Sequence, residues 1–365
     1  MSKKLNLLVV SMLTLPINSA FAVPVSAPAN YPADYQKIID AANKEGKVVI
    51  YSTTDTAAAA PIIKEFEMLY PDITVEYNDM NSTEIYNRYI SEQASFSGSG
   101  DIIWNSSMDT GLKLAIDYAQ PYHSPEANNL PNWAVWKDTV YGTTYEPLVF
   151  IYNKRLIKPE ETPTSHAALA TLIKSQTNRF KNKVTTYDIE KSALGFMLAV
   201  EDMKNDANYI EHLKDIASAG MVVQSSTGTM LERVSSGENL IGYNILDPYA
   251  KTRAEKDLSL GIAYPTDYTL VLSRVIFISK QAKNVNAAKL WLDFLLSQKG
   301  QDILANQANI TSIRDDINGD NDIAGTTKML GNALKPIPVD ETLLEYLQQN
   351  KRLDFLKQWR SLTGK

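Results

Sequence analysis

Three consecutive hydroxyl residues, Ser52, Thr53 and Thr54, stand where an anion could be bound. They follow the short apolar run 48–51, which is typical of a buried strand, and they precede a helical pattern. Hydroxyl groups and the unpaired N–H groups of a helix N-terminus together suit a doubly charged anion. Asp55 would repel such an anion unless its side chain turns away to cap the helix. The loop is therefore predicted to anchor an anion, with a plain helix cap as the alternative.

Polar residues also follow the next two predicted strands. Trp104 offers an aromatic wall, Asn105 an amide and Ser106 a hydroxyl, a combination typical of small-molecule sites. An ordinary strand-to-helix turn is the alternative for this loop. Asn81 either adds a donor to the same site or caps the helix that follows it.

The second half of the chain carries a further group of polar residues near the ends of predicted strands and helices. Hydroxyls and amides there can bind the oxygens of a sugar or glycerol unit, and a carboxylate can accept from hydroxyls or pair with a ligand amine. Single tyrosines are weaker candidates, because the chain contains 19 and tyrosine commonly serves in packing. The candidates are Tyr187, Ser192, Ser226, Thr227, Tyr243, Asn244 and Asp247.

Arg274 is the best placed cation for a bound dianion. The apolar run 275–278 beside it should hold its backbone rigid, and its guanidinium could grip a phosphate with two hydrogen bonds. A salt bridge between neighbouring chain segments is the other role open to it.

Strands and helices alternate along the chain, which predicts parallel sheets flanked by helices, with ligands outside the carboxyl ends of the strands. Two long β-rich segments, 139–153 and 261–280, interrupt the alternation. The predicted strands are 48–51, 73–77, 101–104, 183–187 and 241–245, and the predicted helices are 35–47, 57–70, 82–96, 165–174, 192–203 and 341–362.

The N-terminus is typical of a cleavable secretory signal over residues 1–22. Lys3 and Lys4 precede an apolar run that is too short to span a bilayer, and small residues stand at the expected cleavage site, Ala20 and Ala22. We therefore expect a periplasmic protein whose mature chain does not insert into the membrane. Residues 23–35 are expected to be a lead-in without a functional role.

The amino-acid composition and net charge limit the classes of partner and of chemistry that the chain can have. The formal net charge of −6 disfavours binding to nucleic acid or to anionic lipid. The absence of cysteine excludes disulfides, a lipid-bearing cysteine and a thiol nucleophile. No Gly-x-Ser-x-Gly motif occurs either, so we expect a binding protein, and a monomer, with a carboxylate-based hydrolase as the enzymatic alternative.

Several motifs in order resemble the iron-type family of extracytoplasmic solute-binding proteins of ABC importers. They are Glu45-Gly46-Lys47, Tyr51-Ser52, residues 79–87, Tyr152-Asn153-Lys154 and the helix over 287–304. The resemblance implies an α/β protein with the type II periplasmic-binding-protein fold, in which two doubly wound lobes are joined by two β-type hinge crossings. Lobe 1 would comprise 36–146 and 275–330, and lobe 2 would comprise 147–274 and 331–365 with a C-terminal helix.

Within that family, ferric-ion members hold the metal with a pair of adjacent tyrosines. This chain has no adjacent tyrosines, and its region 242–249 contains only isolated ones, so no metal ligand and no cofactor are expected. The hydroxyl loop is similar to that of members that bind hexose phosphates, phosphoglycerate or aminoalkylphosphonates.

The resemblance thus implies capture of a small anionic solute by lobe closure and its delivery to an inner-membrane ABC permease. The alternatives are a ferric-ion or ferric-chelate receptor of an importer, and a ligand-presenting sensor or a hydrolase on the same fold.

Overall fold

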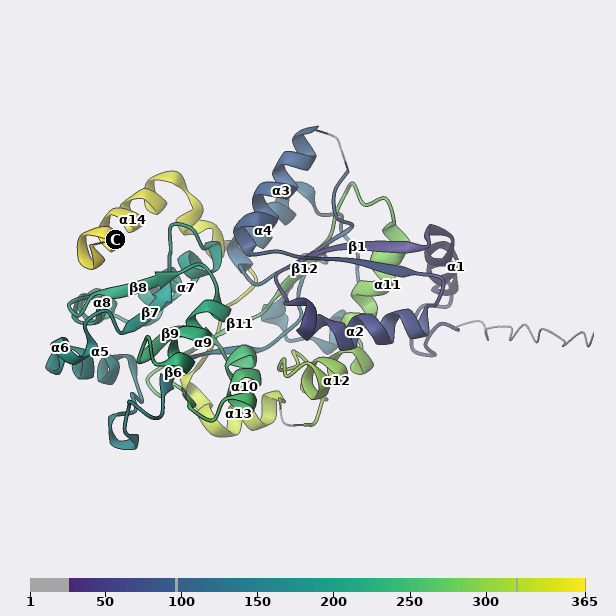
Figure 1. Cartoon of the computed structure of the whole chain (residues 1–365). Coiled ribbons are helices and arrows are strands. Elements are labelled where there is room, and N and C mark those ends of the chain that lie inside the picture. Colours follow the sequence, from purple (N-terminus) through teal and green to yellow (C-terminus); the bar gives the residue numbers. More distant parts are fainter. Residues whose placement is uncertain (1–25, 96–97, 320, 365) are drawn as a thin grey trace, which may run out of the picture.

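The computed structural model describes residues 26–95, 98–319 and 321–364 (Figure 1). The predicted signal segment lies outside these residues. The lead-in is tied to the body of the protein, since the hydroxyl of Tyr35 donates to Asp293 (2.6 Å). Among the described residues, no helix combines the length and apolar character needed to cross a membrane.

The first sheet is mixed. Its β1 pairs in parallel with β2 and β3, as the alternating pattern predicts, but β12 runs antiparallel to β3 and adds a β-rich half. The prediction of a parallel sheet is therefore right for β2, β1 and β3 only. The next strand, β12, comes from a distant part of the sequence and runs antiparallel to β3. The strand order is β2 (Thr74–Asp79), β1 (Lys47–Ser52), β3 (Ile102–Asn105), β12 (Val275–Ile278), β5 (Val140–Gly142) and β4 (Val135–Trp136).

Helices cover both faces of this sheet, which explains why its central strands β1, β3 and β12 contain apolar runs without alternation. Ile102 and Trp104 belong to the core under α1, α2 and α11, whereas Ile103 belongs to the core under α3 and α4. Gly46 ends α1 with a left-handed backbone (φ 72°), which a glycine adopts at little cost. The helices are α1 (Gln36–Glu45), α2 (Thr56–Leu69), α3 (Ser82–Ser95), α4 (Met108–Tyr118), α11 (Val285–Leu296), α12 (Gln298–Gln307) and α13 (Ile323–Leu330), with 3-10 turns η1 (Ala127–Asn129), η2 (Asn132–Ala134) and η4 (Gly331–Ala333).

The second sheet also mixes directions. Its β7 pairs in parallel with β8 and β9, while β6 runs antiparallel to β9, β10 and β11. The strand order is β13 (Leu334–Pro336), β11 (Thr269–Leu272), β6 (Glu146–Asn153), β9 (Ile241–Leu246), β7 (Val184–Tyr187) and β8 (Met221–Gln224), with β10 (Leu260–Ala263) on β6.

Helices flank this sheet as well, and the C-terminal one differs from its prediction. The single helix expected over 341–362 is broken, because Gln348 has an extended backbone (φ −63°, ψ 131°) between a 3-10 turn and α14. The helices are α5 (His166–Ser175), α6 (Thr177–Phe180), α7 (Ala193–Asn205), α8 (Tyr209–Ala217), α9 (Thr227–Ser236), α10 (Asp247–Lys256) and α14 (Gln349–Thr363), with 3-10 turns η3 (Pro159–Glu161) and η5 (Glu341–Leu347).

Two adjacent crossings join the sheets, one between β5 and β6 and the other between β11 and β12. They are hydrogen-bonded to each other: Thr143 N–H donates to Arg274 O (2.9 Å), and Arg274 N–H donates to Thr144 Oγ1 (2.9 Å). A third passage, without a strand of its own, leads from α12 to β13 in the second sheet. Below, lobe 1 and lobe 2 denote the two sheets with their helices.

Candidate ligand-binding cavity

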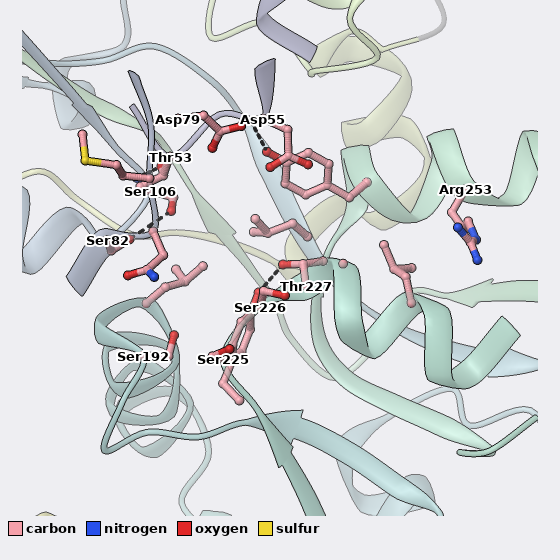
Figure 2. A pocket seen from close by; sticks show the side chains of 18 of the residues that line it. Thr53, Asp55, Asp79, Ser82, Ser106, Ser192, Ser225, Ser226, Thr227 and Arg253 are labelled. Atoms are coloured by element: carbon pink, nitrogen blue, oxygen red, sulfur yellow. Dashed lines mark hydrogen bonds between the residues drawn. The ribbon is translucent and has the colours of Figure 1, made fainter. Parts of the chain in front are cut away.

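A cavity of about 530 Å³ lies between the two lobes (Figure 2). The carboxyl ends of β1, β2 and β3 approach it from lobe 1, and those of β7 and β8 approach it from lobe 2, as expected for doubly wound sheets. Of the predicted site residues, Thr53, Asn81, Ser106, Tyr187, Ser192, Ser226 and Thr227 border this cavity.

Of the three consecutive hydroxyl residues at the end of β1 and after it, only Thr53 borders the cavity. Thr53 borders it, and its Oγ1 accepts from the backbone N–H of Ser106 (2.8 Å). Ser52 and Thr54 are fully buried beneath the loop, where Ser52 Oγ accepts from the N–H of Thr54 (3.0 Å). These two hydroxyls hold the loop in shape and do not face the cavity.

Arg274 is fully buried behind the same loop. Its Nε and Nη2 donate to the two carboxylate oxygens of Glu146 (2.7 and 2.9 Å), and Glu146 is fully buried too. Its Nη1 donates to Thr53 O (3.1 Å) and Thr54 Oγ1 (3.0 Å). Of the two roles left open for Arg274, the salt bridge is the one present, and it joins both crossings to the cavity loop.

The N-terminus of α2 already has an intramolecular anion. Asp79 Oδ2 accepts from the N–H of Thr56 (2.9 Å), while Asp55 N–H donates to the hydroxyl of Tyr249 (3.2 Å). The expectation that Asp55 itself caps this helix is wrong, because its side chain makes no capping bond. Asp79 takes the role because β2 pairs with β1 in a register that places Asp79 opposite Ser52.

Of the other lobe 1 residues predicted to bind a ligand, Asn81 and Ser106 border the cavity, whereas Trp104 and Asn105 do not. Asn81 and Glu84 cap α3 reciprocally: Asn81 Oδ1 accepts from the N–H of Glu84 (2.9 Å), and Glu84 Oε2 accepts from the N–H of Asn81 (3.0 Å). Trp104 faces the core, where its Nε1 donates to Thr143 (2.8 Å), and buried Asn105 accepts from the N–H of Ser107 (3.0 Å). The aromatic wall predicted from Trp104 does not line the cavity.

Lobe 2 presents helix caps to the cavity. Ser192 Oγ accepts from the N–H of Gly195 at the start of α7 (3.1 Å), and Ser226 Oγ accepts from the N–H of Thr229 at the start of α9 (3.3 Å). Both helices therefore begin at the cavity wall. Tyr187 shares a hydrogen bond with Thr227 beside them.

Three predicted lobe 2 residues lie away from the cavity. Tyr243 and Asn244 both donate to the buried Asp202 (2.6 Å each), which fixes them within the sheet. Asp247 is buried, accepts from Tyr264 (2.6 Å) and forms an ion pair with Lys251 (2.9 Å). Each already has polar partners inside lobe 2.

Sequence reasoning missed one wall of the cavity, formed by α10. Tyr249, Thr252, Arg253 and Lys256 border the cavity, and their spacing of three to four residues places them on one helix face. That spacing is visible in the sequence and could have identified this wall. Asp55 and Asp79 also border the cavity, and burial raises the pKa of Asp55, with the nearby charge of Asp79 adding to this and Arg274 opposing it.

A family model described as "Bacterial extracellular solute-binding protein" matches residues 61–330 of the chain. The chain belongs to this family. A solved substrate-binding protein of an ABC transporter from Agrobacterium tumefaciens is 34% identical to this solute-binding protein, with a TM-score of 0.83 over 87% of this chain and 94% of that one. No curated protein matches the sequence.

Two more distant structures share the fold of this solute-binding protein. The periplasmic binding protein AfuA from Actinobacillus pleuropneumoniae, with fructose-6-phosphate bound, is 18% identical with a TM-score of 0.72, covering 87% of this chain and 99% of that one. Iron-bound HitA from Pseudomonas aeruginosa is 17% identical with a TM-score of 0.65 over the same shares. The predicted fold class, a type II periplasmic-binding-protein fold of two α/β lobes, is confirmed.

Proposed function

We propose that this solute-binding protein is the periplasmic receptor of an ABC importer and captures a small anionic solute, of the phosphate or phosphonate type, for an inner-membrane permease. The description of the Agrobacterium relative as part of an ABC transporter supports the importer role. The sugar phosphate bound by AfuA supports an anion as cargo, although that likeness rests on fold alone. In this proposal the protein releases its ligand unchanged, and incubation with a bound candidate should yield no product.

The observation that supports an anionic ligand is that helix N-termini from both lobes converge on one cavity. Helices α3, α7 and α9 begin with Ser82, Ala193 and Thr227, and each start lies at or beside a cavity-lining residue. The first N–H groups of a helix have no intrahelical acceptor, and the helix dipole makes that end positive. Several such ends around one space favour negative charge.

Contacts across the cavity are consistent with capture by lobe closure. Besides the bond between Asp55 and Tyr249, Thr83 Oγ1 donates to Lys191 O (2.8 Å) and accepts from the N–H of Ala193 (3.2 Å). The crossings contain few residues, so a hinge motion there would make or break these contacts together.

Gly228 offers a selective test of the α9 anchor. It is the second residue of α9 and borders the cavity, and a Cβ added there would meet only Ser226 Oγ, at 4.0 Å. Gly228→Ala should therefore raise the melting temperature of the free protein, because alanine is the better helix former. It should also weaken binding of a phosphate or phosphonate solute in calorimetry at least tenfold, by blocking approach to the amides. Unchanged affinity for a solute that binds the wild type would contradict the α9 anchor.

The ferric alternative has less support around this cavity. Tyr187 and Tyr249, which border it, already use their hydroxyls within the protein: Tyr187 shares a hydrogen bond with Thr227, and Tyr249 accepts from the N–H of Asp55. Within the described ranges, no group of three or more His, Cys, Asp or Glu side chains is arranged to hold a metal ion. A thermal-shift screen with ferric citrate beside sugar phosphates and phosphonates separates the candidates, since a bound ligand stabilises the folded protein.

A further inference from the structure

A second cavity, of about 250 Å³, also lies between the lobes and shares no lining residue with the first, the cavity of about 530 Å³. Helices α3 and α4 of lobe 1 line one side of it, and α7, η5 and α14 of lobe 2 line the other (Figure 1). The starts of α3 and α7 stand between the two cavities. Ser82 and Ser192 border the first cavity, whereas the residues that follow them, Thr83 and Ala193, are hydrogen-bonded to each other and border the second.

Two basic side chains, one from each lobe, border the second cavity. Lys113 belongs to α4 and Arg352 to α14. In the part of the chain that the structure describes, neither side chain forms an ion pair or a hydrogen bond. Each has an aromatic ring as its neighbour instead: Lys113 Nζ lies 5.7 Å from the ring centre of Tyr86, and Arg352 Cζ lies 4.1 Å from that of Phe196. The rings leave the hydrogen-bond donors of both cations unused.

The acidic groups near these cations already have partners. Glu190 borders the second cavity, and its two carboxylate oxygens accept from Arg360 (2.5 and 2.8 Å). The charge of Arg352 also acts on the buried Asp109, but that carboxylate already accepts two hydrogen bonds of 2.7 Å within α4 and the residue before it. The chain has 42 acidic and only 36 basic residues, so partners for two cations were not scarce. The second cavity therefore keeps two positive charges available.

Two neutral groups that can donate hydrogen bonds line the same cavity. The side chains of Tyr86 and Asn87 border it from α3, and neither has a hydrogen bond to another described residue. Together with the ammonium and guanidinium groups, they make a lining rich in free donors. Such a lining suits a ligand that carries acceptor oxygens and negative charge.

We propose that the second cavity binds a small oxyanion with two negative charges, such as phosphate or sulfate, between Lys113 and Arg352. The guanidinium can donate two parallel hydrogen bonds to an oxyanion, and the ammonium supplies a compact charge from the opposite lobe. Because its ligands come from both lobes, the bound anion stabilises the contact between them. This inference goes beyond the proposed function, since the oxyanion is a second ligand at a separate site.

Calorimetry with inorganic phosphate and with sulfate, on the full mature protein, tests the site. Lys113→Gln and Arg352→Gln should each weaken one binding event at least tenfold, and that event should also weaken as salt rises, because ionic attraction is screened. Lys113 is exposed, so its substitution spares the core. Arg352→Lys keeps the charge and should lose less affinity than Arg352→Gln. In thermal-shift assays sulfate should stabilise the wild type more than Lys113→Gln.

Lys289 provides the matched control. Its Nζ also lies over a tyrosine ring, 5.2 Å from the centre of Tyr122, and it borders neither cavity. Among the described residues it too forms no ion pair. Lys289→Gln therefore removes the same charge from a similar setting and should leave the affinity for phosphate and sulfate unchanged. A loss equal to that of Lys113→Gln would show a general effect of net charge and would overturn the site.

Gly228→Ala separates the second cavity from the first, where an anion is also proposed to bind. It should leave the second binding event unchanged. Phosphate binding that Gly228→Ala weakens but Lys113→Gln and Arg352→Gln do not would overturn the second site and leave the proposed function standing. The reverse pattern would contradict the α9 anchor for phosphate and leave this inference standing. Binding of neither phosphate nor sulfate by the wild type at low salt would overturn the second site.

Discussion

Replacing Arg274 by methionine tests whether the buried ion pair between the crossings supports the cavity. The change leaves the carboxylate of Glu146 fully buried without its bidentate partner, a situation that costs about 3–5 kcal/mol. It also removes two hydrogen bonds to the loop, those to Thr53 O and Thr54 Oγ1. Urea titration should therefore show a loss of about 3–5 kcal/mol in the free energy of unfolding, and calorimetry should show weaker solute binding.

A second substitution distinguishes a lost charge pair from a lost side chain. Combining Arg274→Met with Glu146→Gln removes both charges, and a neutral pair of similar volume is often tolerated. The double variant should be at least about 2 kcal/mol more stable than the sum of the single effects predicts. Additive single effects, or a loss below about 1 kcal/mol for Arg274→Met alone, would refute the reasoning.

Arg314 provides the matched control for the effect on binding. It is nearly buried and pairs with the buried Glu126 (2.6 Å) in lobe 1, but neither residue borders the cavity. Arg314→Met should lower the free energy of unfolding by a similar amount while leaving the affinity for solute unchanged. A comparable loss of affinity in this variant would show that Arg274 acts on binding only through general stability.

Three further predictions each concern one residue: Ser226, Tyr249 and Asp293. Ser226→Ala removes the cap of α9 and should cost about 1 kcal/mol in urea titrations, whereas Ser226→Gly should cost only a few tenths. Tyr249→Phe removes the hydroxyl that accepts from Asp55 N–H across the cavity, so small-angle scattering of the free protein should show a larger radius of gyration. Burial raises the pKa of Asp293 to about 7, opposed by hydrogen bonds from Ser124, Tyr122 and Tyr35. Between about pH 4 and 7 the folded carboxyl thus holds a proton that the unfolded one has lost, so stability should fall as pH rises through this window, and Asp293→Asn should remove that fall.

Local patterns in the sequence predicted most of the elements. The apolar run 48–51 is part of β1, both faces of whose sheet are covered by helices, and the helix predicted over 35–47 is α1, which ends at Glu45 before Gly46. The C-terminal helix was predicted in one piece and is interrupted at Gln348, which nothing in the local pattern marks.

Candidate site residues were harder to predict, because a polar residue at the end of a strand can face either way. Thr53 faces the cavity while its neighbours Ser52 and Thr54 face inward. Trp104 has the aromatic surface of a binding wall, but it belongs to β3, and helices cover both faces of that strand, so its side chain is buried in the core. Orientation depends on the register of the sheet.

The sequence by itself indicated the strands and helices through local periodicity, and the order of its motifs indicated the family and, through that resemblance, the two-lobed α/β fold. It also indicated the edge of each sheet that borders the cavity. Only the tertiary structure decided which charges face the cavity. Arg274 is neutralised by Glu146, which lies far from it in the sequence. Asp79 occupies the N-terminus of α2, where the sequence predicted that an anionic ligand would bind. Pairings between distant segments set the charge of the site, and no local pattern records them.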